Sequence, residues 1–415
     1  MFKPISLARW VWVAVLALFM VHDSPGLAAE KPSPDAGITT REIQALERYR
    51  AELREFRKEF GGSRDLPRGP FFQFGMGSRT KCLFKEGTLR EAVTGKVLRR
   101  WDTTNTIIVP SEYTVCMVTL SGERVRIFED ENGVWIQERD HRDLIQGTGS
   151  KVRLSAFAGH RYVSILRVLH HEILMNIIEG WPLPNFYVYR KPWYRDGAMM
   201  AMCLKATGNL DLIRDWIRSL TEPYDRNNAG ETEADNLGQA LFLVSCVSDK
   251  SHPLVAKVLR ELPRFDVRDH YGFYIKGRSD FAEHPVYQTK WLKYGLHALG
   301  LEDRYSIPSL PDSYSSLFWM DYRDRHVAGT EATDRDLYPY LGWATDHFQG
   351  RKLSPISNGD YPLTWETKAS QADYSGMKII DPVFAEQKTA APHTWHAAEV
   401  FLYLLDSSKN PLEAK

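Results

Sequence analysis

Cysteine is scarce in this chain, whose 415 residues include only Cys82, Cys116, Cys203 and Cys246. Four cysteines are too few for the disulfide framework of a small secreted scaffold, and none stands in a Cys-x-x-Cys or zinc-finger spacing. Cys82 and Cys116 both lie in a segment with strand-like patterning and could form a disulfide. Cys203 and Cys246 lie in apolar helical stretches, where we expect buried free thiols.

An excess of either charge is also missing, because 53 Lys and Arg balance 53 Asp and Glu. Binding of nucleic acid or of an anionic membrane would need clustered Lys and Arg, so neither partner is expected. The chain has no Gly-x-Ser-x-Gly elbow, no glycine-rich phosphate loop and no His-Glu-x-x-His element. Adjacent side chains on a helix point about 100° apart, so His170-His171-Glu172 cannot easily share a metal ion. His396 and Glu399 supply only two ligands, and we therefore predict no metal and no cofactor.

Long apolar runs are absent beyond the N-terminus. Met1, Lys3 and Arg9 give a basic start, and Trp10 to Val21 is a nearly unbroken apolar run with small residues after it. This pattern is typical of a secretory signal peptide over residues 1–29. The run is shorter than the roughly 20 residues that span a bilayer, although an uncleaved membrane anchor remains the alternative. We expect an exported protein, periplasmic or secreted, that is a monomer and leaves the membrane after cleavage.

The apolar spacing divides the rest of the chain into three parts. Residues 30–70 are typical of a polar linker and a charged amphipathic helix, and residues 71–158 of a β-rich module with short runs between turn signals. From residue 159 to 415 the spacing is helical. The expected helices cover residues 161–178, 196–207, 210–220, 235–247, 253–262, 286–299, 333–348 and 394–405. Strands followed by many helices with long aromatic loops predict a mainly α fold, an (α/α) toroid of helical hairpins with an N-terminal β-rich module.

Aromatic residues are abundant, with 12 Trp, 19 Tyr and 19 Phe. Aromatic rings pack against the apolar faces of pyranose sugars, and they are also ordinary core residues. The composition therefore favours a carbohydrate ligand without deciding it.

Polar residues interrupt the helical pattern at three junctions between a loop and a helix. The first is Trp193-Tyr194-Arg195-Asp196-Gly197, the second runs from Glu231 to Gln239, and the third is Phe384-Ala385-Glu386-Gln387, shortly before the last helix. The first resembles the Trp-x-Arg-Asp element of glucoamylases, which belong to the six-hairpin glycosidases. That resemblance implies that Arg195 and Asp196 hold sugar hydroxyls, and a guanidinium fork and a carboxylate suit such positioning. Trp193, Tyr194, Trp365 and Trp395 join them as expected substrate-binding residues.

The same resemblance implies a two-carboxyl hydrolysis of an oligo- or polysaccharide, with inversion at the anomeric carbon. Glu386-Gln387 resembles the glucoamylase segment that carries the base, which makes Glu386 one candidate. Glu366 is a rival base, since the adjacent Trp365 indole could raise its pKa by desolvation. For the proton donor, the resemblance to glucoamylases implies Glu233, whereas the resemblance to processing α-glucosidases implies Asp235. Both pairs stay open at this point.

Other functions fit some of these residues. Asp196, Glu233 and Asp235 each precede a helical run, where an acidic residue commonly caps the helix. A polysaccharide lyase on the same toroid could use Tyr187, Tyr189 or Tyr194 as its base, with Arg195 neutralising a uronate carboxyl. A non-catalytic protein that binds or helps export a polysaccharide would retain the aromatic loops with the carboxyls idle.

Overall fold

The computed structural model describes residues 38–60, 64–67, 69–147, 151–226, 229–280, 282–310, 356–369 and 372–407. The expected signal peptide and the expected helix at 333–348 lie outside these residues. Within these ranges, no helix is long and apolar enough to span a membrane. By their contacts, all of them belong to one compact unit.

Two antiparallel sheets occupy the first third of the chain, and in each the strands pair in sequence order. The four-stranded sheet consists of β1 (Phe71–Phe74), β2 (Cys82–Lys85), β3 (Thr88–Glu91) and β4 (Val97–Arg100). The five-stranded sheet consists of β5 (Thr103–Val109), β6 (Thr114–Thr119), β7 (Arg124–Glu129), β8 (Val134–Glu138) and β9 (His141–Gln146). Burial alternates along β7, where Val125 and Ile127 are buried and Arg126 and Phe128 are partly exposed. One face of this sheet is therefore core, and the other carries polar and aromatic side chains.

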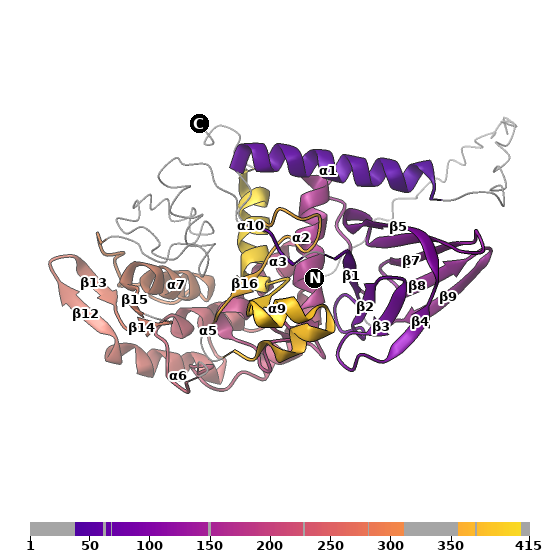
Figure 1. Cartoon of the computed structure of the whole chain (residues 1–415). Helices are drawn as coiled ribbons and strands as arrows, with labels where there is room; N and C mark the ends of the chain where they lie inside the picture. Colours follow the sequence, from indigo (N-terminus) through magenta and orange to yellow (C-terminus); the bar gives the residue numbers. More distant parts are fainter. Residues whose placement is uncertain are drawn as a thin grey trace, which may run out of the picture. The chain divides into compact units, whose positions relative to one another are not determined.

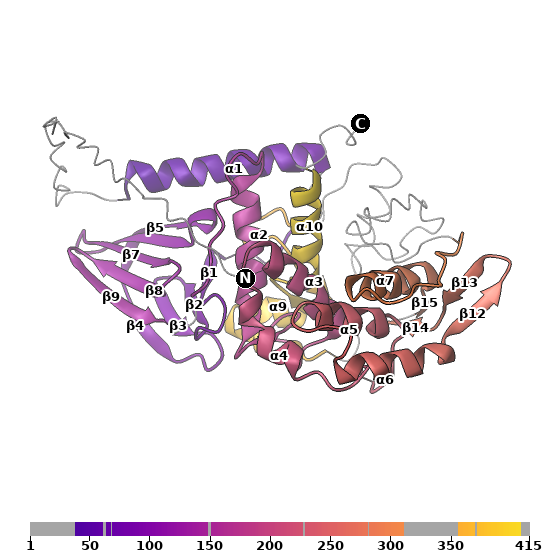
Figure 2. The same cartoon turned by 180° about the vertical axis from the view of Figure 1, so that it is seen from behind.

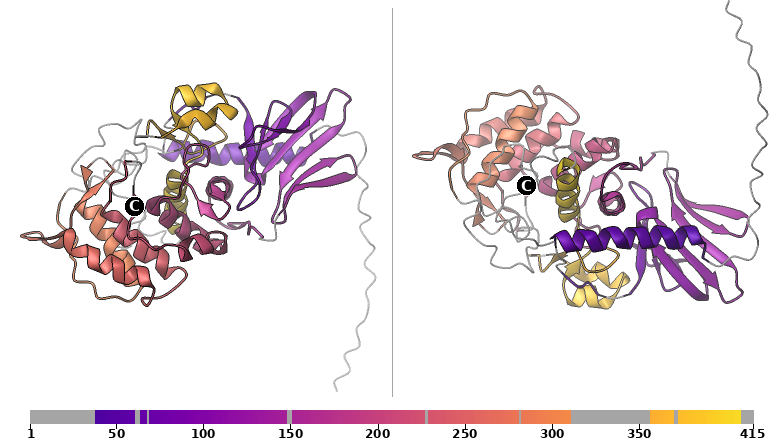
Figure 3. Two further views of the ribbon diagram at one scale, coloured as in Figure 1. Left: turned by 90° about the horizontal axis from the view of Figure 1, so that it is seen from below. Right: turned by 90° about the horizontal axis from the view of Figure 1, so that it is seen from above.

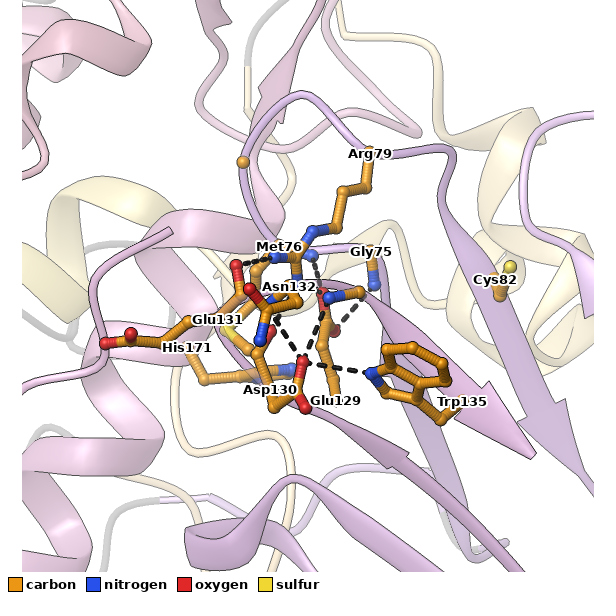
Figure 4. Close-up of polar contacts among 12 residues, drawn as sticks. Gly75, Met76, Arg79, Cys82, Glu129, Asp130, Glu131, Asn132, Trp135 and His171 are labelled. Carbon is orange, nitrogen blue, oxygen red and sulfur yellow. Dashed lines mark hydrogen bonds and ion pairs between the residues drawn. The ribbon is translucent and has the colours of Figure 1, made fainter. Parts of the chain in front are cut away.

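A buried ion pair joins the two sheets (Figure 4). Glu129, the last residue of β7, accepts hydrogen bonds from the backbone N of Gly75 at 2.8 Å and of Met76 at 2.7 Å. Arg79 donates Nη1 to the same carboxylate at 2.7 Å and to the carbonyl oxygen of Asp130. Gly75 has φ +101°, and a Cβ there would lie 2.3 Å from the backbone oxygen of Thr80, so the turn after β1 requires glycine.

One helix, α1, precedes the two sheets and the others follow them, with small hairpins between them (Figure 1). In the described part of the chain the helices are α1 (Thr40–Phe60), α2 (Val163–Met175), α3 (Tyr194–Ala206), α4 (Arg214–Arg218), α5 (Asp235–Ser245), α6 (Pro253–Glu261), α7 (Pro285–Ala298), α9 (Pro382–Glu386) and α10 (Thr394–Ser407). The hairpins pair β10 (Ile177–Ile178) with β11 (Trp181–Pro182), β12 (Asp266–Asp269) with β13 (Gly272–Ile275), β14 (Arg278–Ser279) with β15 (Ala282–Glu283), and β16 (Glu366–Thr367) with β17 (Thr389–Ala390). Short 3₁₀ helices include η1 (Pro110–Glu112) and η5 (Tyr374–Ile379).

The longer helices pack in the order α2, α10, α3, α5 and α7, which differs from their order along the chain (Figure 2). α5 and α7 approach backbone to backbone through two glycines. A Cβ on Gly238 would lie 2.2 Å from the backbone of Trp291, and one on Gly295 would lie 2.4 Å from the backbone oxygen of Gly238. Alanine at either position would force the two helices apart.

Helix α1 connects the five-stranded sheet to the helical part (Figure 3). Tyr49, Leu53 and Phe56 are fully buried at steps of four and three residues, the spacing of one helix face. The helix contacts β5, η1 and α2, and near its end the Phe60 ring lies 6.0 Å from the ring of Tyr403 in α10.

The predicted toroid is wrong, because the chain has a mixed α/β fold with several small antiparallel sheets. The individual helices were predicted well: the spacing at 235–247 corresponds to α5 (Asp235–Ser245) and that at 286–299 to α7 (Pro285–Ala298). The stretch expected at 210–220 contains only a 3₁₀ turn and the five-residue α4. Between α6 and α7 the chain forms two hairpins, and between residues 356 and 393 it forms short strands, η5 and the five-residue α9. Periodicity identified single helices but carried no information on their number or pairing.

A disulfide between Cys82 and Cys116 is not formed, and all four cysteines are free. Cys82 lies in β2 and Cys116 in β6, which belong to different sheets. Both are buried, and burial raises the pKa of each thiol to about 12. They therefore act as small apolar side chains of the core.

Glu172 is a fully buried carboxyl in the last turn of α2. It accepts hydrogen bonds from the backbone N of Leu363 and from Oγ1 of Thr364, the latter at 2.6 Å. Burial raises the pKa of Glu172 to about 8, although these hydrogen bonds oppose the rise. The carboxyl thus fixes the segment that leads into β16, two residues before Glu366.

Glu172→Gln tests this position through the pH dependence of stability. The folded-state pKa of Glu172 is raised, so its contribution is fully present below the unfolded-state pKa near 4.5 and is lost as pH rises toward 8. That loss approaches about 1.4 kcal/mol per pH unit within this window. The difference in melting temperature between Glu172→Gln and wild type should therefore shift in favour of the variant from pH 5 to pH 8. Glu47→Gln, an exposed change on α1, should show no such trend, and parallel curves for Glu172→Gln and wild type would contradict the assignment.

Candidate functional site

Three helices begin at one polar network. α3 begins at Tyr194, α5 at Asp235 and α10 at Thr394, and α3 packs against both of the others. The unpaired N–H groups at a helix N-terminus carry partial positive charge and favour nearby carboxylates. Two of the three polar clusters that interrupted the helical pattern, those around Arg195 and Asp235, thus lie at helix N-termini, where the dipoles stabilise negative charge.

Arg195 is the centre of this network. Its Nε donates to Oδ2 of Asp235 at 3.0 Å, its Nη2 to Oε2 of Glu233 at 2.8 Å, and its Nη1 to Oδ2 of Asp280. The Arg195 side chain is 5% exposed and that of Asp235 is fully buried, whereas that of Asp280 is 30% exposed. One guanidinium therefore compensates three carboxyl groups that come from two separate segments.

Asp235 is satisfied on all sides. Besides Arg195, it accepts from Oγ of Ser279 at 2.6 Å and from Nε2 of Gln239 at 2.8 Å. Gln288 of α7 holds the β14–β15 hairpin in place, since it exchanges hydrogen bonds with the backbone of Gly277 and donates to Ser279. A buried carboxylate with this many donors has a structural role, which separates it from Glu233.

Glu233 lies at the edge of the same network. Its Oε1 accepts from the backbone N of Asp280 at 2.9 Å, and Oε2 accepts from Arg195. Burial raises the pKa of Glu233 to about 7, and the charges of Asp235 and Asp280 add to the rise while Arg195 opposes it. A carboxyl that retains its proton near neutral pH is suited to donate it.

Glu366 has the opposite environment. It comes from β16, accepts a hydrogen bond from the hydroxyl of Tyr189, and lies 3.4 Å from Nε2 of His393. Burial alone would raise its pKa, but the charge of His393 and the hydrogen bonds from His393 and Tyr189 outweigh burial and lower it. The expected rise caused by the Trp365 indole is therefore wrong. For the same reason the pKa of His393 is raised against the effect of burial.

Asp196 is influenced both by the charges around Glu233 and by those around Glu366. Burial raises its pKa to about 7; His393 and Arg195 oppose this rise, and Glu366 and Asp280 add to it. Its Oδ1 is buried and has no hydrogen-bond partner among the residues that the structure describes. An unpaired buried carboxyl oxygen is unusual in a native protein, and a ligand hydroxyl would satisfy it.

The four expected aromatic contacts differ in exposure. Trp193 and Trp395 are half-buried: the Trp193 ring lies 5.0 Å from that of Tyr189, and Cζ of Arg195 lies 5.2 Å from the Trp395 ring. Trp365 is fully buried and belongs to the core, so it offers no face to a sugar. Tyr194 is also buried, and its hydroxyl donates to the carbonyl oxygen of Glu222.

Glu386 does not join the network. It is exposed at the end of α9, and no contact with Arg195, Glu366 or Asp196 places it near them. Of the two candidate bases, Glu366 acts on another candidate carboxyl, since its charge raises the pKa of Asp196.

Helix capping does not explain these acidic residues. Neither α3 nor α5 has a hydrogen bond from the side chain of its own N-cap residue. The backbone N of Tyr194 instead donates to Asp225, a residue from another loop. Glu233 and Asp235 accept hydrogen bonds from Arg195 instead, and Asp196 makes no capping bond, so capping accounts for none of the three.

The tyrosines proposed for a lyase are poorly suited to abstract a proton. Burial raises the pKa values of Tyr187, Tyr189 and Tyr194, whereas a tyrosine base needs a lowered pKa. Arg195 is already bound to three carboxyls, so neutralising a substrate carboxylate would compete with them.

Sequence reasoning missed Asp280, Ser279 and His393. Asp280 and Ser279 belong to a hairpin with two residues per strand, which is too short to show any periodicity. His393 precedes α10 and could have been noticed only as a polar residue at a helix junction. In the described ranges no group of three or more His, Cys, Asp or Glu side chains could hold a metal ion.

Comparison of the chain with protein-family models, with curated proteins and with solved structures gave no match. The resemblance to glycosidases therefore stays a prediction that rests on the short motifs alone.

Arg195→Met tests whether this guanidinium holds the network together. The change leaves Glu233 and Asp235 buried without a counter-charge, so we expect unfolding at pH 7 to require about 3–5 kcal/mol less. Removing the cation takes away the charge that lowers the pKa of Glu233, so the loss should shrink at pH 5, where Glu233 can be protonated. Urea denaturation at both pH values measures the effect.

Arg214→Met is the matched control, because Arg214 forms an exposed ion pair with Asp211 and should cost at most about 1 kcal/mol. An equal loss in both variants, or a loss for Arg195→Met that does not change with pH, would argue against the central role of Arg195.

Proposed function

We propose that the chain is an exported glycoside hydrolase in which Glu233 donates a proton to the leaving oxygen and Glu366 is the ionised carboxylate. The observation that carries the proposal is the opposite pKa shift of the two groups, which are linked through Asp196: its pKa responds to Glu366 and to Arg195, the partner of Glu233. Burial and neighbouring acids keep Glu233 protonated, while His393 and Tyr189 keep Glu366 ionised. Glycoside hydrolysis requires such a pair, one carboxyl as acid and the other as base or nucleophile.

The surrounding residues support a sugar ligand. The unpaired Oδ1 of Asp196 can accept a hydroxyl, and the half-buried rings of Trp193 and Trp395 can pack against a pyranose face. In this proposal Arg195 positions the carboxyls to which it donates hydrogen bonds, and it does not have to contact sugar hydroxyls. The substrate is an oligo- or polysaccharide, and inversion is the stereochemical outcome that the sequence resemblance implies.

Three single substitutions test the assignment. Glu366→Gln should reduce kcat by at least about a hundredfold, because the amide keeps the shape of the side chain but cannot be ionised. Glu233→Gln should impair hydrolysis of natural glycosides most, and that of nitrophenyl glycosides least, because nitrophenolate needs little protonation to leave. Release of reducing sugar from a panel of glycans identifies the substrate. The kcat of each variant on this substrate is then compared with that of the wild type, for variants whose melting temperature equals that of the wild type.

Glu386→Gln is the matched control, since Glu386 was the other base candidate from the sequence and is an exposed residue at the end of α9. It should retain nearly full activity. Full activity of all three variants would end the glycosidase proposal, and inactivation by Glu386→Gln alone would reverse the choice of base. Glycan binding without turnover by the wild type would favour the non-catalytic alternative, and an unsaturated product that absorbs in the ultraviolet would favour a lyase.

A further inference from the structure

A small cavity lies where the first turns of α1 meet η1, β6 and β7. Its volume is about 110 Å³, well above the roughly 10–15 Å³ that one water needs. It shares no residue with the network around Arg195. Its lining comprises Arg41, Glu42, Ala45 and Arg48 of α1, with Val109, Glu112, Thr114 and Arg126.

The two glutamates of the lining are already compensated by arginines outside it. Glu42 forms an ion pair with Arg124 and accepts hydrogen bonds from Thr39 at the start of α1. Glu112 forms an ion pair with Arg167 at 3.5 Å. The acidic groups of the lining therefore form their ion pairs with arginines outside it rather than with those in it.

The three arginines of the lining have no such partner. Arg41, Arg48 and Arg126 form no ion pair with any residue that the structure describes. Arg126 donates only a long hydrogen bond of 3.4 Å to Thr114, and its buried Nε has no acceptor in the described part of the chain. Three guanidinium groups around one small cavity favour an oxyanion, which each can bind with two parallel N–H groups.

A strip of stacked side chains continues from this cavity across the partly exposed face of the five-stranded sheet. Cζ of Arg126 lies 4.4 Å from the Phe128 ring, and Cζ of Arg142 lies 4.7 Å from Phe128 and 3.8 Å from Trp135. Phe128 and Trp135 are directly opposite each other on β7 and β8. The strip thus alternates cations with aromatic rings.

We propose that the cavity is an anion-binding site for one carboxylate, sulfate or phosphate group of an acidic glycan, whose chain extends along the strip. A free inorganic anion would use the cavity alone, whereas the strip offers aromatic rings to the sugars beyond it; its Arg142 is already paired with Asp130 at 3.0 Å. Nucleic acid is disfavoured because the chain as a whole carries no net positive charge.

Equilibrium binding tests the site without depending on turnover, so an absence of glycosidase activity would leave the result unaffected. The wild type should bind polygalacturonate or dextran sulfate and should bind neutral dextran much more weakly, as measured by calorimetry at low salt. The triple variant Arg41→Gln, Arg48→Gln and Arg126→Gln should bind the acidic glycan at least about tenfold more weakly, a loss of about 1.4 kcal/mol.

The matched control removes the same charge from exposed positions outside the cavity, Arg54→Gln, Arg99→Gln and Arg100→Gln, and should change the affinity by less than about threefold. Arg126 is partly buried, so its replacement could lower the melting temperature of the triple variant. In that case the double variant Arg41→Gln and Arg48→Gln, which changes only exposed residues, is used instead. Equal weakening in the cavity and control variants would overturn the site. Equal affinity for neutral dextran or for single-stranded DNA, or binding of inorganic phosphate with neither acidic glycan, would overturn the ligand class.

Discussion

The Arg195 guanidinium is the interaction on which the candidate site depends. Three carboxyl groups from the start of α5 and from the β14–β15 hairpin converge on it, and two of them are almost inaccessible to water. Buried carboxylates are stable only when paired and hydrogen-bonded. Arg195 is therefore the reason that Glu233 and Asp280 can lie side by side at the N-terminal ends of α3 and α5.

The acids differ in how far this cation, His393 and hydrogen-bond donors compensate their charge. Asp235 receives hydrogen bonds from three side chains and is fixed. Glu233 and Asp196 receive less compensation, and burial raises the pKa values of both to about 7. Glu366 has its own cation, His393, which lowers its pKa. A single network thus contains carboxyls that favour opposite protonation states at the same pH.

The sequence predicted the parts of the site that lie at helix starts. Arg195, Glu233 and Asp235 stood out because polar residues interrupted an apolar helical period, and α3, α5 and α10 begin within two residues of the expected positions. The choice between Glu366 and Glu386 could not be made, since Glu366 lies in a two-residue strand and Glu386 ends a five-residue helix. The position of such short elements depends on tertiary contacts such as that of Glu172 with Thr364. Asp280 was missed because a two-residue strand has no pattern, and the toroid was predicted wrongly because helix pairing depends on contacts such as Gly238 against Trp291.

The central claim is that Glu233 and Glu366 hold opposite charge states, and a carboxyl titration measures this directly. Protein labelled with ¹³C at glutamate carboxyls can be titrated by NMR, with resonances assigned by their loss in Glu233→Gln and Glu366→Gln. The account predicts that Glu233 titrates near pH 7 and Glu366 below the ordinary glutamate value. Titration of both groups below pH 4.5, or of Glu366 at a higher pH than Glu233, would contradict it.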